Sequence, residues 1–325
     1  MALILTRQDV MQVLTMEDCI NVVEQAFLES NQGTAVLPLR TAITPADGIS
    51  LYMPAFLKEM GALACKVVTV YKDNPKKQNL PVTIGKVLLQ NPDSGEVICI
   101  MDGGYLTAVR TGAASGVATK YLANDESKMT VGIFGAGVQA QMQLAAMCAV
   151  RDIQKAIVYD ISEDAINNFI NSLKDKLDIE IIAGKTVNEV LQAHIICTAT
   201  SSATPLFNGD NIKPGTHING IGSHTPDARE LDVAIVKRSK FIGDSREACF
   251  NEAGDIMIPL KDGEITESHF YADLGEIVAG TKNGRETEDE ITIFKSNGLA
   301  IQDAATAKLV YDKAVEMNIG TKIEL

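Results

Sequence analysis

The stretch Met129-Thr130-Val131-Gly132-Ile133-Phe134-Gly135-Ala136-Gly137-Val138-Gln139-Ala140 decides the fold of the larger part of this 325-residue chain. Its apolar first half predicts a buried strand, and residues 138–150 predict a helix that follows at once. In the G-x-G-x-x-A pattern between them, Gly135 permits a tight turn, Gly137 lets the backbone approach a pyrophosphate, and Ala140 allows close helix packing. Helix starts also attract phosphates. We therefore predict a dinucleotide-binding turn; the alternative is a turn between strand and helix that binds nothing.

An acidic residue follows the next predicted strand. This strand covers residues 155–159, and Asp160 comes directly after it, 25 residues beyond Gly135. A carboxylate at this place can accept hydrogen bonds from both ribose hydroxyls, and it repels a 2′-phosphate. We therefore expect NAD rather than NADP as the cofactor.

Apolar runs and helical stretches alternate through the rest of this region, which is typical of a parallel α/β domain. A helix is expected at residues 163–176, and strands are expected at residues 179–183, 194–198, 217–221, 241–243 and 291–294. The segment Thr198-Ala199-Thr200-Ser201 ends one of these strands, at the sheet edge where ligands bind. It can contact the cofactor or only cap the next turn, and the sequence leaves both possibilities open.

The first 120 residues or so have a different pattern. Thr15 can cap a helix that carries Ile20, Val23 and Phe27 on one face and ends at Gly33. Short β-type runs follow at residues 48–53, 62–71, 82–89 and 97–101, separated by turn signals. Strand following strand predicts an antiparallel sheet. We expect the last helix, at residues 299–317, to pack back on this first domain.

Composition and charge exclude several classes of protein. The formal net charge of −13 repels polyanions, so nucleic acid is not an expected partner. No apolar run approaches the ~20 residues that span a bilayer. The first residues lack the pattern of a signal peptide, so a cytoplasmic protein is expected. The six cysteines and four histidines are too scattered for a disulfide framework or a metal site, which predicts buried free thiols and no metal.

Further motifs carry a resemblance to a known family. Residues 110–123, Arg-Thr-Gly-Ala-Ala-Ser-Gly-Val-Ala-Thr-Lys-Tyr-Leu-Ala, and the glycine turn after them closely resemble the ornithine cyclodeaminase/mu-crystallin family. The same is true of Tyr52-Met53-Pro54, the strand with Lys66, Asn91-Pro92-Asp93-Ser94-Gly95 and Ser296-Asn297-Gly298-Leu299-Ala300. The similarity extends over nearly the whole chain, in order and in spacing. The chain is therefore identified as a member of that family.

The resemblance implies a fold and an activity. The fold class is α/β, with a Rossmann NAD-binding domain at residues 123–299 inserted into an α+β substrate-binding and dimerisation domain of residues 1–122 and 300–325. The implied activity is that of an enzyme, an NAD(P)-dependent oxidoreductase acting on the Cα–N bond of amino or imino acids. A small anionic substrate and a second copy in a homodimer are the implied partners.

The resemblance also assigns substrate-binding residues, namely Arg40, Met53, Lys66 and Arg110. An arginine binds a carboxylate as a planar bidentate fork, which suits Arg40 and Arg110. A lysine beside two guanidinium groups has a lowered pKa, so Lys66 can exchange a proton with the substrate nitrogen near neutral pH. Without the resemblance, Arg40 would be read as a surface charge and Lys66 as a snorkelling lysine at a strand end.

On the cofactor side, the resemblance makes Arg110 the first residue of a helix whose start faces the cofactor, with Thr111 near the phosphates. The small residues that follow can equally serve a close helix contact. The expected cofactor-binding residues are Arg110, Thr111, Gly135, Gly137, Val138, Gln139, Asp160, Thr200, Asn219, Ile221 and Ser296.

One segment departs from the pattern of the ornithine cyclodeaminases and the alanine dehydrogenase type, which carry a catalytic Asp in a Gly-Asp-x-Pro-Gly-like run. Here the segment begins Gly222-Ser223-His224-Thr225-Pro226-Asp227, so that His224 takes the position of that Asp. This argues against ornithine cyclisation. Lys66, with His224 or Asp227 assisting, forms the expected catalytic set. Alternatively, His224 only binds backbone and Asp227 only caps a helix beginning near Glu230.

These observations support a main hypothesis and its rivals. The main hypothesis is reduction of a cyclic ketimine such as Δ1-pyrroline-2-carboxylate, which needs a hydride donor, a carboxylate clamp and one acid. Ornithine cyclodeaminase and alanine dehydrogenase are the alternatives among enzymes. A nucleotide-binding protein without turnover is the alternative of a different class.

Overall fold

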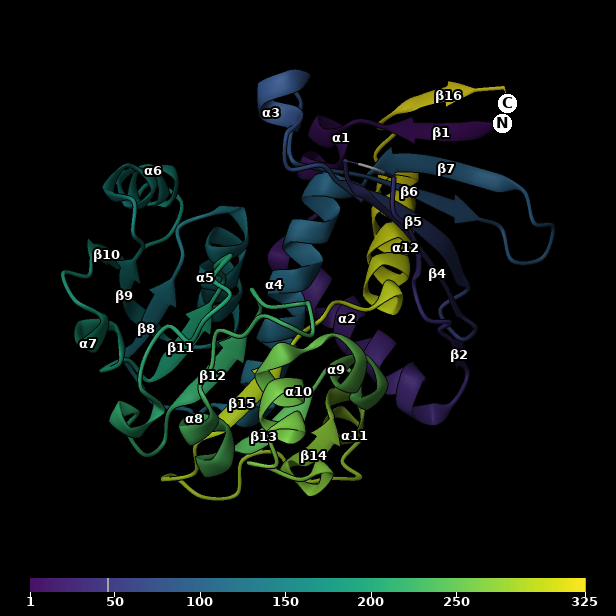
Figure 1. Cartoon of the computed structure of the whole chain (residues 1–325). Helices are drawn as coiled ribbons and strands as arrows, with labels where there is room; N and C mark the ends of the chain where they lie inside the picture. Colours follow the sequence, from purple (N-terminus) through teal and green to yellow (C-terminus); the bar gives the residue numbers. More distant parts are fainter. Residues whose placement is uncertain (46, 325) are drawn as a thin grey trace. The chain divides into compact units, whose positions relative to one another are not determined.

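The computed structural model describes residues 1–45 and 47–324, and these form two compact units (Figure 1). Unit 1 contains Met1–Arg110 together with Leu299–Leu325, and unit 2 contains Thr111–Gly298. The expected boundary lies between residues 122 and 123, at the end of the helix α4 (Gly103–Leu122). The division instead falls inside this helix, between Arg110 and Thr111. The second part of this helix packs within unit 2, where a Cβ on Gly112 would lie 2.6 Å from the carbonyl oxygen of Met142.

Unit 1 is built on one sheet with the strand order β16-β1-β7-β6-β5-β4-β2, and β3 pairs with β4. The predicted antiparallel arrangement holds from β4 to β7, whereas β1 runs parallel to β7. The elements of unit 1 before α4 are β1 (Ala2–Leu5), α1 (Arg7–Val13), α2 (Met16–Gln32), β2 (Ala35–Val36), β3 (Thr41–Ile43), β4 (Ile49–Leu57), β5 (Ala62–Val70), α3 (Asn74–Lys77), β6 (Thr83–Gln90) and β7 (Val97–Asp102). The chain closes with α12 (Ala300–Glu316) and β16 (Thr321–Ile323).

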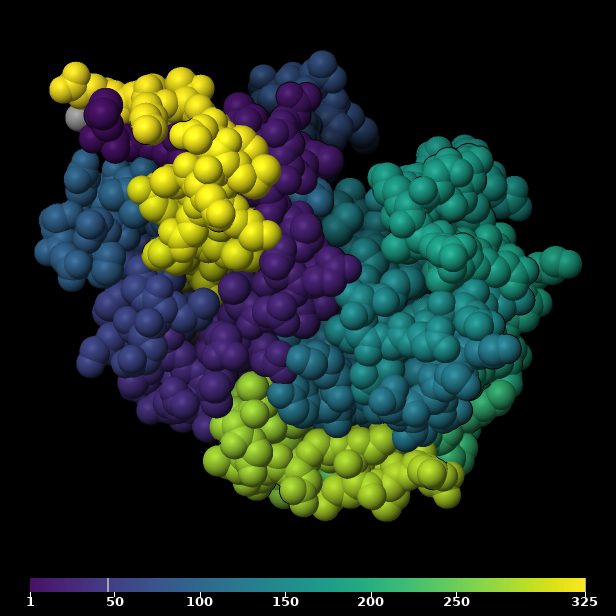
Figure 2. All heavy atoms as spheres, turned by 180° about the vertical axis from the view of Figure 1, so that it is seen from behind, coloured from purple at the N-terminus to yellow at the C-terminus, as the bar shows by residue number. Residues whose placement is uncertain are grey.

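The last helix packs on the first elements of the chain, as the sequence predicts. α12 contacts α1 and α2 and lies on β4, β5 and β6. The C-terminal segment, yellow in Figure 2, accordingly lies against the purple N-terminal helices. Thr15 caps α2 by accepting a hydrogen bond from the backbone N–H of Asp18, and Gly33 ends this helix at a φ of 77°. The side chain of Asp18 also pairs with Lys313 of α12, so that α2 and α12 are joined at this point.

Unit 2 holds a sheet of eight parallel strands in the order β10-β9-β8-β11-β12-β15-β13-β14. The strand order reverses between β8 and β11, which is the switch point where doubly wound folds bind nucleotides. Its elements are β8 (Met129–Phe134), α5 (Val138–Val150), β9 (Ile153–Tyr159), α6 (Glu163–Leu173), β10 (Glu180–Ala183), α7 (Val187–Val190), β11 (Ile195–Thr198), η1 (Gly209–Asn211), β12 (His217–Gly220), α8 (Val233–Arg238), β13 (Lys240–Gly243), α9 (Arg246–Glu252), α10 (Gly254–Lys261), η2 (Glu267–His269), β14 (Phe270–Asp273), α11 (Leu274–Val278) and β15 (Thr292–Lys295).

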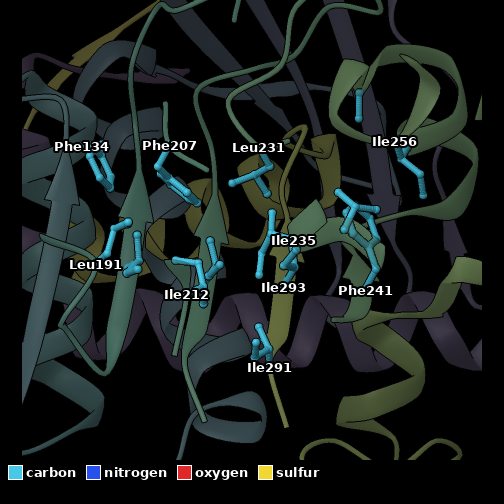
Figure 3. Close-up of a cluster of buried hydrophobic side chains, with 14 of the residues drawn as sticks. Phe134, Leu191, Phe207, Ile212, Leu231, Ile235, Phe241, Ile256, Ile291 and Ile293 are labelled. Carbon is cyan, nitrogen blue, oxygen red and sulfur yellow. The ribbon is translucent and has the colours of Figure 1, made fainter. Parts of the chain in front are cut away.

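A buried cluster of apolar side chains fixes this sheet against the elements that cover it (Figure 3). Phe134 at the end of β8 packs against Phe207, with ring centroids 5.3 Å apart. Ile293 of β15 and Ile235 of α8 belong to the same cluster. Burial of side chains of this size contributes about 1.5–3 kcal/mol each. This packing therefore fixes the positions of the strand ends that carry the candidate cofactor residues.

One expectation and one alternative about helix starts are wrong. Arg110 does not open a helix: α4 already begins at Gly103, where the carboxylate of Asp102 accepts a hydrogen bond from the N–H of Tyr105 at 2.9 Å. No helix begins near Glu230 with Asp227 as its cap. Instead α8 begins at Val233, and its cap is Asp232, whose carboxylate accepts the N–H of Ile235 at 3.0 Å.

None of the helices in the described part of the chain is long and apolar enough to cross a membrane. Within the same residues, no group of three or more His, Cys, Asp or Glu side chains is arranged to hold a metal ion. The six cysteines are free, and Cys65 and Cys148 are only partly buried.

Candidate functional site

Lys66 lies in the middle of β5, and its side chain is only 2% exposed. Alternation along the strand places it on the same face as Ala62 and Ala64, which are buried as well. On the neighbouring strand β4 it pairs directly with Met53, whose side chain is also buried. This is the sheet face that α12 covers, so the ammonium group points into the interior of unit 1.

Asp303, in the first turn of α12, joins two buried cations. Its Oδ2 lies 2.7 Å from Nζ of Lys66, and its Oδ1 accepts a hydrogen bond from Nε of Arg110 at 2.9 Å. The guanidinium of Arg110 also donates from Nη1 to Oε1 of Gln302, at 2.7 Å. All four side chains are buried. Two bonds occupy two of the five N–H donors of a guanidinium, so this arrangement orients Arg110 without exhausting its capacity to bind an anion.

The surroundings lower the pKa of Lys66 to about 7. Burial is the largest cause, because it disfavours the charged ammonium group, and the positive charge of Arg110 acts in the same direction. Asp303 opposes both effects through its charge and its hydrogen bond, while the charge of Arg40 lowers the pKa further. The side chain can therefore take up or release a proton near neutral pH, as the sequence predicts.

The structure thus brings together Met53, Lys66 and Arg110, and the charge of Arg40 acts on the same ammonium group. Arg40 precedes β3, which pairs with β4 across Thr41 and Tyr52, and its side chain is partly exposed. This set can bind a small carboxylate and supply one proton. Sequence reasoning missed Asp303 and Gln302. The available signal was an Asp in the first turn of the last expected helix, where a negative charge is favoured.

In unit 2, the two glycines of the turn after β8 are needed for different reasons. Gly135 has a φ of 95°, and a Cβ there would lie 2.5 Å from the carbonyl oxygen of Ala199, so the fold itself requires glycine. Gly137 caps α5 at a φ of −83°, and a Cβ on it would have no atom within 4 Å. Any residue could occupy this position in the bare fold. Open space in front of the N-terminus of α5 is the cradle that a pyrophosphate needs.

Asp160 stands directly after β9 and is tied to the glycine turn. Its Oδ2 accepts a hydrogen bond from the N–H of Ala136, and its Oδ1 accepts one from the N–H of Ser162, both at 2.9 Å. A carboxylate offers about four lone-pair sites, so acceptor capacity remains for hydroxyl groups. The carboxylate is therefore fixed beside the phosphate cradle, at the place where it can bind a ribose.

The other expected cofactor residues lie in different surroundings. Val138, exposed, and Gln139, partly exposed, form the first turn of α5. Thr200 donates to Glu230 and also accepts the N–H of Ser202 at 3.1 Å, so it caps the next turn in this structure. Asn219 is wholly buried and donates to the hydroxyl of Thr119 at 3.1 Å. Thr111, Ile221 and Ser296 are buried, and the hydroxyl of Ser296 donates to Asp244 at 3.3 Å.

His224 and Asp227 lie on the exposed loop between β12 and α8. Nδ1 of His224 is 3.1 Å from the carbonyl oxygen of Gly222, a contact that fits the backbone-bound alternative for this residue. Asp227 occupies a turn of the same loop. Both residues belong to unit 2, whereas Lys66 belongs to unit 1.

The parallel sheet with its switch point, the glycine turn and Asp160 define a dinucleotide-binding domain of the Rossmann class. The whole chain can be placed more narrowly. The family model described as "Ornithine cyclodeaminase/mu-crystallin family" matches residues 1–318, and the chain belongs to this family.

Several proteins similar to this chain are named as oxidoreductases of imino or amino acids. The structure of Δ1-pyrroline-2-carboxylate reductase from Thermococcus litoralis, in complex with NADH and L-proline, matches with 49% identity and a TM-score of 0.95, covering 99% of this chain and 100% of that one. An archaeal alanine dehydrogenase dimer with bound NAD matches with 37% identity and a TM-score of 0.94, covering 100% and 99%. A Δ1-pyrroline-2-carboxylate reductase from Bacillus cereus is 38% identical over 327 residues, 99% of each chain.

The open space at Gly137 leads to a prediction. Gly137→Ala places a methyl group where the pyrophosphate would approach, so we expect the affinity for NADH to fall about tenfold or more. Folding stability should change by less than about 1 kcal/mol, since only the weak capping preference of glycine is lost. Fluorescence titration with NADH and thermal unfolding measure the two effects. Gly104→Ala, at an exposed position in the first turn of α4, is the matched control; equal losses of affinity in both variants would contradict the assignment.

Proposed function

We propose that this protein is an NADH-dependent reductase of cyclic α-imino acids, with Δ1-pyrroline-2-carboxylate as its substrate. The observation that carries the proposal is the buried Lys66, with its pKa near 7, held by Asp303 beside Arg110. The substrate class combines a carboxylate with a C=N bond, and this cluster supplies a cationic clamp and one acid. Relatives that are reductases of this substrate add support.

Each residue has one task in the proposed reaction. Arg110 and Arg40 bind the substrate carboxylate, and Asp303 and Gln302 hold the guanidinium of Arg110 in its orientation. Lys66 donates its proton to the imine nitrogen. A bound NADH would supply the hydride that the adjacent carbon accepts. The C=N bond becomes a CH–NH bond, and Lys66 is left neutral. A pKa near 7 suits this exchange, because an acid works best when its pKa is close to the working pH.

The cofactor is proposed to be NAD(H) rather than NADP(H). The residues of unit 2 fit a dinucleotide, because the space at Gly137 and the N-terminus of α5 can receive phosphates and Asp160 can accept ribose hydroxyls. Both oxygens of Asp160 accept backbone N–H groups, so the carboxylate is held in a fixed orientation. Its negative charge would repel a 2′-phosphate.

We propose a homodimer as the working assembly. Val36, Leu39 and Ile43 lie in or beside β2 and β3 and expose more than half of their surface, which is costly for a lone chain. The similar archaeal alanine dehydrogenase is a dimer. Sedimentation equilibrium should give twice the mass of the 34.9-kDa chain, and a monomer at micromolar concentration would contradict the proposal.

The direct test of the function is NADH oxidation with Δ1-pyrroline-2-carboxylate, Δ1-piperideine-2-carboxylate, or pyruvate plus ammonia. Turnover with the cyclic imines is expected. Turnover with pyruvate and ammonia alone would instead make the chain an alanine dehydrogenase. Ammonia release from ornithine without net change in NADH would make it a cyclodeaminase. NADH binding with no turnover of any of these would leave a nucleotide-binding protein.

The choice of cofactor can be tested with one substitution. Asp160→Ser removes the charge that opposes a 2′-phosphate, so kcat/KM with NADPH relative to NADH should rise by about tenfold or more. Activity with NADH should fall, because the carboxylate that binds the ribose is lost. A wild-type enzyme that already prefers NADPH would show that Asp160 has been assigned the wrong role.

The pH dependence of the reduction tests the role of Lys66. Lys66 must be protonated to act as the acid, so kcat/KM for the imino acid should fall as the pH rises through about 7. In the pH profile of kcat, the fall should lie at higher pH than in the profile of kcat/KM, because the bound substrate carboxylate raises the pKa of Lys66 in the complex. A profile that is flat from pH 6 to pH 9 would exclude Lys66 as the acid.

Two substitutions should shift the falling limb of the kcat/KM profile in opposite directions along the pH axis. Arg40→Gln removes a positive charge that lowers the pKa of Lys66, so the kcat/KM limb should shift to higher pH. Asp303→Asn removes a negative charge that raises it, so the limb should shift to lower pH. Each shift is expected to be between a fraction of a unit and about one unit. Shifts of the same sign in both variants would contradict this account.

A further inference from the structure

Glu230 is wholly buried and binds the ends of two strands of the parallel sheet. Its Oε1 accepts hydrogen bonds from the N–H and the hydroxyl of Thr200, both at 2.7 Å. Its Oε2 accepts the hydroxyl of Thr198 at 2.7 Å and the N–H of Gly222 at 2.8 Å. Thr198 and Thr200 lie at the carboxyl end of β11, and Gly222 follows the carboxyl end of β12. One carboxylate thus receives four donors from two adjacent strand ends.

A second buried carboxylate connects this point to a third strand. Oδ1 of Asp255 accepts the backbone N–H groups of Glu230 and Leu231, at 2.8 and 2.9 Å. Its Oδ2 lies 2.9 Å from Nζ of Lys295, the last residue of β15, and Lys295 also donates to the carbonyl of Ser223. Burial alone would lower the pKa of Lys295, but the charges of Asp255 and Glu230 raise it above its ordinary value. The carboxyl ends of β11, β12 and β15 are therefore fixed together.

The position of these strand ends indicates a role for Glu230 in cofactor binding. This role rests on the proposed use of NADH. The glycine turn after β8 and Asp160 after β9 mark the half of the site that takes the adenosine. The nicotinamide half of a bound cofactor would then lie beyond the switch point, over the ends of β11 and β12. We propose that Glu230 is a positioning residue for the nicotinamide ring, acting through the backbone at residues 198–202 and 221–224.

The geometry of the four bonds explains why no amide can replace this carboxylate. Each oxygen of Glu230 accepts one backbone N–H, that of Thr200 on Oε1 and that of Gly222 on Oε2. A glutamine has one oxygen and one NH₂ group, so in either orientation its NH₂ faces a backbone N–H. Hydroxyls can rotate to accept from it, but a backbone N–H cannot. One of the two strand ends must therefore move away in Glu230→Gln.

The loop that carries His224 depends on the same residue. The N–H of Gly222 binds Glu230, and the carbonyl of Gly222 contacts Nδ1 of His224. A Cβ on Gly222 would lie 2.4 Å from Oε1 of Glu230, so the two residues are in close contact. Movement of Gly222 would displace His224 as well.

The test compares the binding of NADH with that of ADP-ribose, so that the contribution of the nicotinamide half can be measured separately. For Glu230→Gln, the affinity for NADH should fall by about tenfold, the loss expected when a buried charged acceptor is removed. The affinity for ADP-ribose, which lacks the nicotinamide, should stay within about twofold of wild type. The rise in nicotinamide fluorescence on binding should also diminish. In the reaction with the imino acid, kcat should fall more than KM for that substrate changes.

Two further variants keep the proposal falsifiable. Thr198→Val removes only the hydroxyl donor to Oε2 of Glu230, so the affinity for NADH should fall by a smaller factor while that for ADP-ribose is kept. This variant provides the test if Glu230→Gln does not fold. Asp232→Asn is the matched control, since this nearby carboxylate accepts the N–H groups of Gly209 and Ile235 and caps α8. It should lower the melting temperature without changing the ratio of NADH to ADP-ribose affinity.

The outcomes are distinct. Equal losses for NADH and ADP-ribose in Glu230→Gln and in Thr198→Val, or no loss in either, would overturn the role of Glu230. A wild-type protein that binds neither NADH nor ADP-ribose would overturn the proposed function itself.

Discussion

The ion cluster of Lys66, Asp303 and Arg110 is the interaction on which unit 1 depends. Two buried cations without a counter-ion would be expensive, and removing one partner of such a pair costs about 3–5 kcal/mol. Asp303 provides the counter-ion from the first turn of α12, so the helix must lie where its carboxylate can reach both cations. The covered face of the sheet, the orientation of Arg110 and the pKa of Lys66 all follow from this placement.

The sequence predicted the elements of both units better than their side-chain partners. Strands and helices with clear periodicity, such as residues 62–70 and 138–150, lie close to where the pattern placed them. Lys66 and Arg110 were identified only through the family resemblance. Asp303 was missed because its partners are more than 190 residues away along the chain, and no local pattern encodes a contact of that separation. The start of α4 was misplaced because the Asp102 cap was overlooked.

Unit 2 shows the same division between what local patterns encode and what tertiary structure adds. The glycine turn was evident from its spacing, but only the structure separates Gly135, which the fold requires, from Gly137, where the fold leaves room. Glu230 was passed over as the start of a helix. Three of its four donors belong to Thr198 and Thr200, 30 to 32 residues before it, and the fourth belongs to Gly222, eight residues before it. They meet at Glu230 because parallel strands end at one edge of a sheet.

The discontinuous course of unit 1 has a consequence for the order of events during synthesis. Unit 2 is one continuous segment, and all of its strands are complete before α12 leaves the ribosome. The first 110 residues emerge earlier, yet β1 still lacks its neighbour β16, and the face of β4 to β6 still lacks its covering helix. Domains usually mature in the order of the chain. Here the N-terminal segment must wait for α12 and β16, and until they arrive its apolar face is exposed to water and Lys66 lacks its counter-ion Asp303.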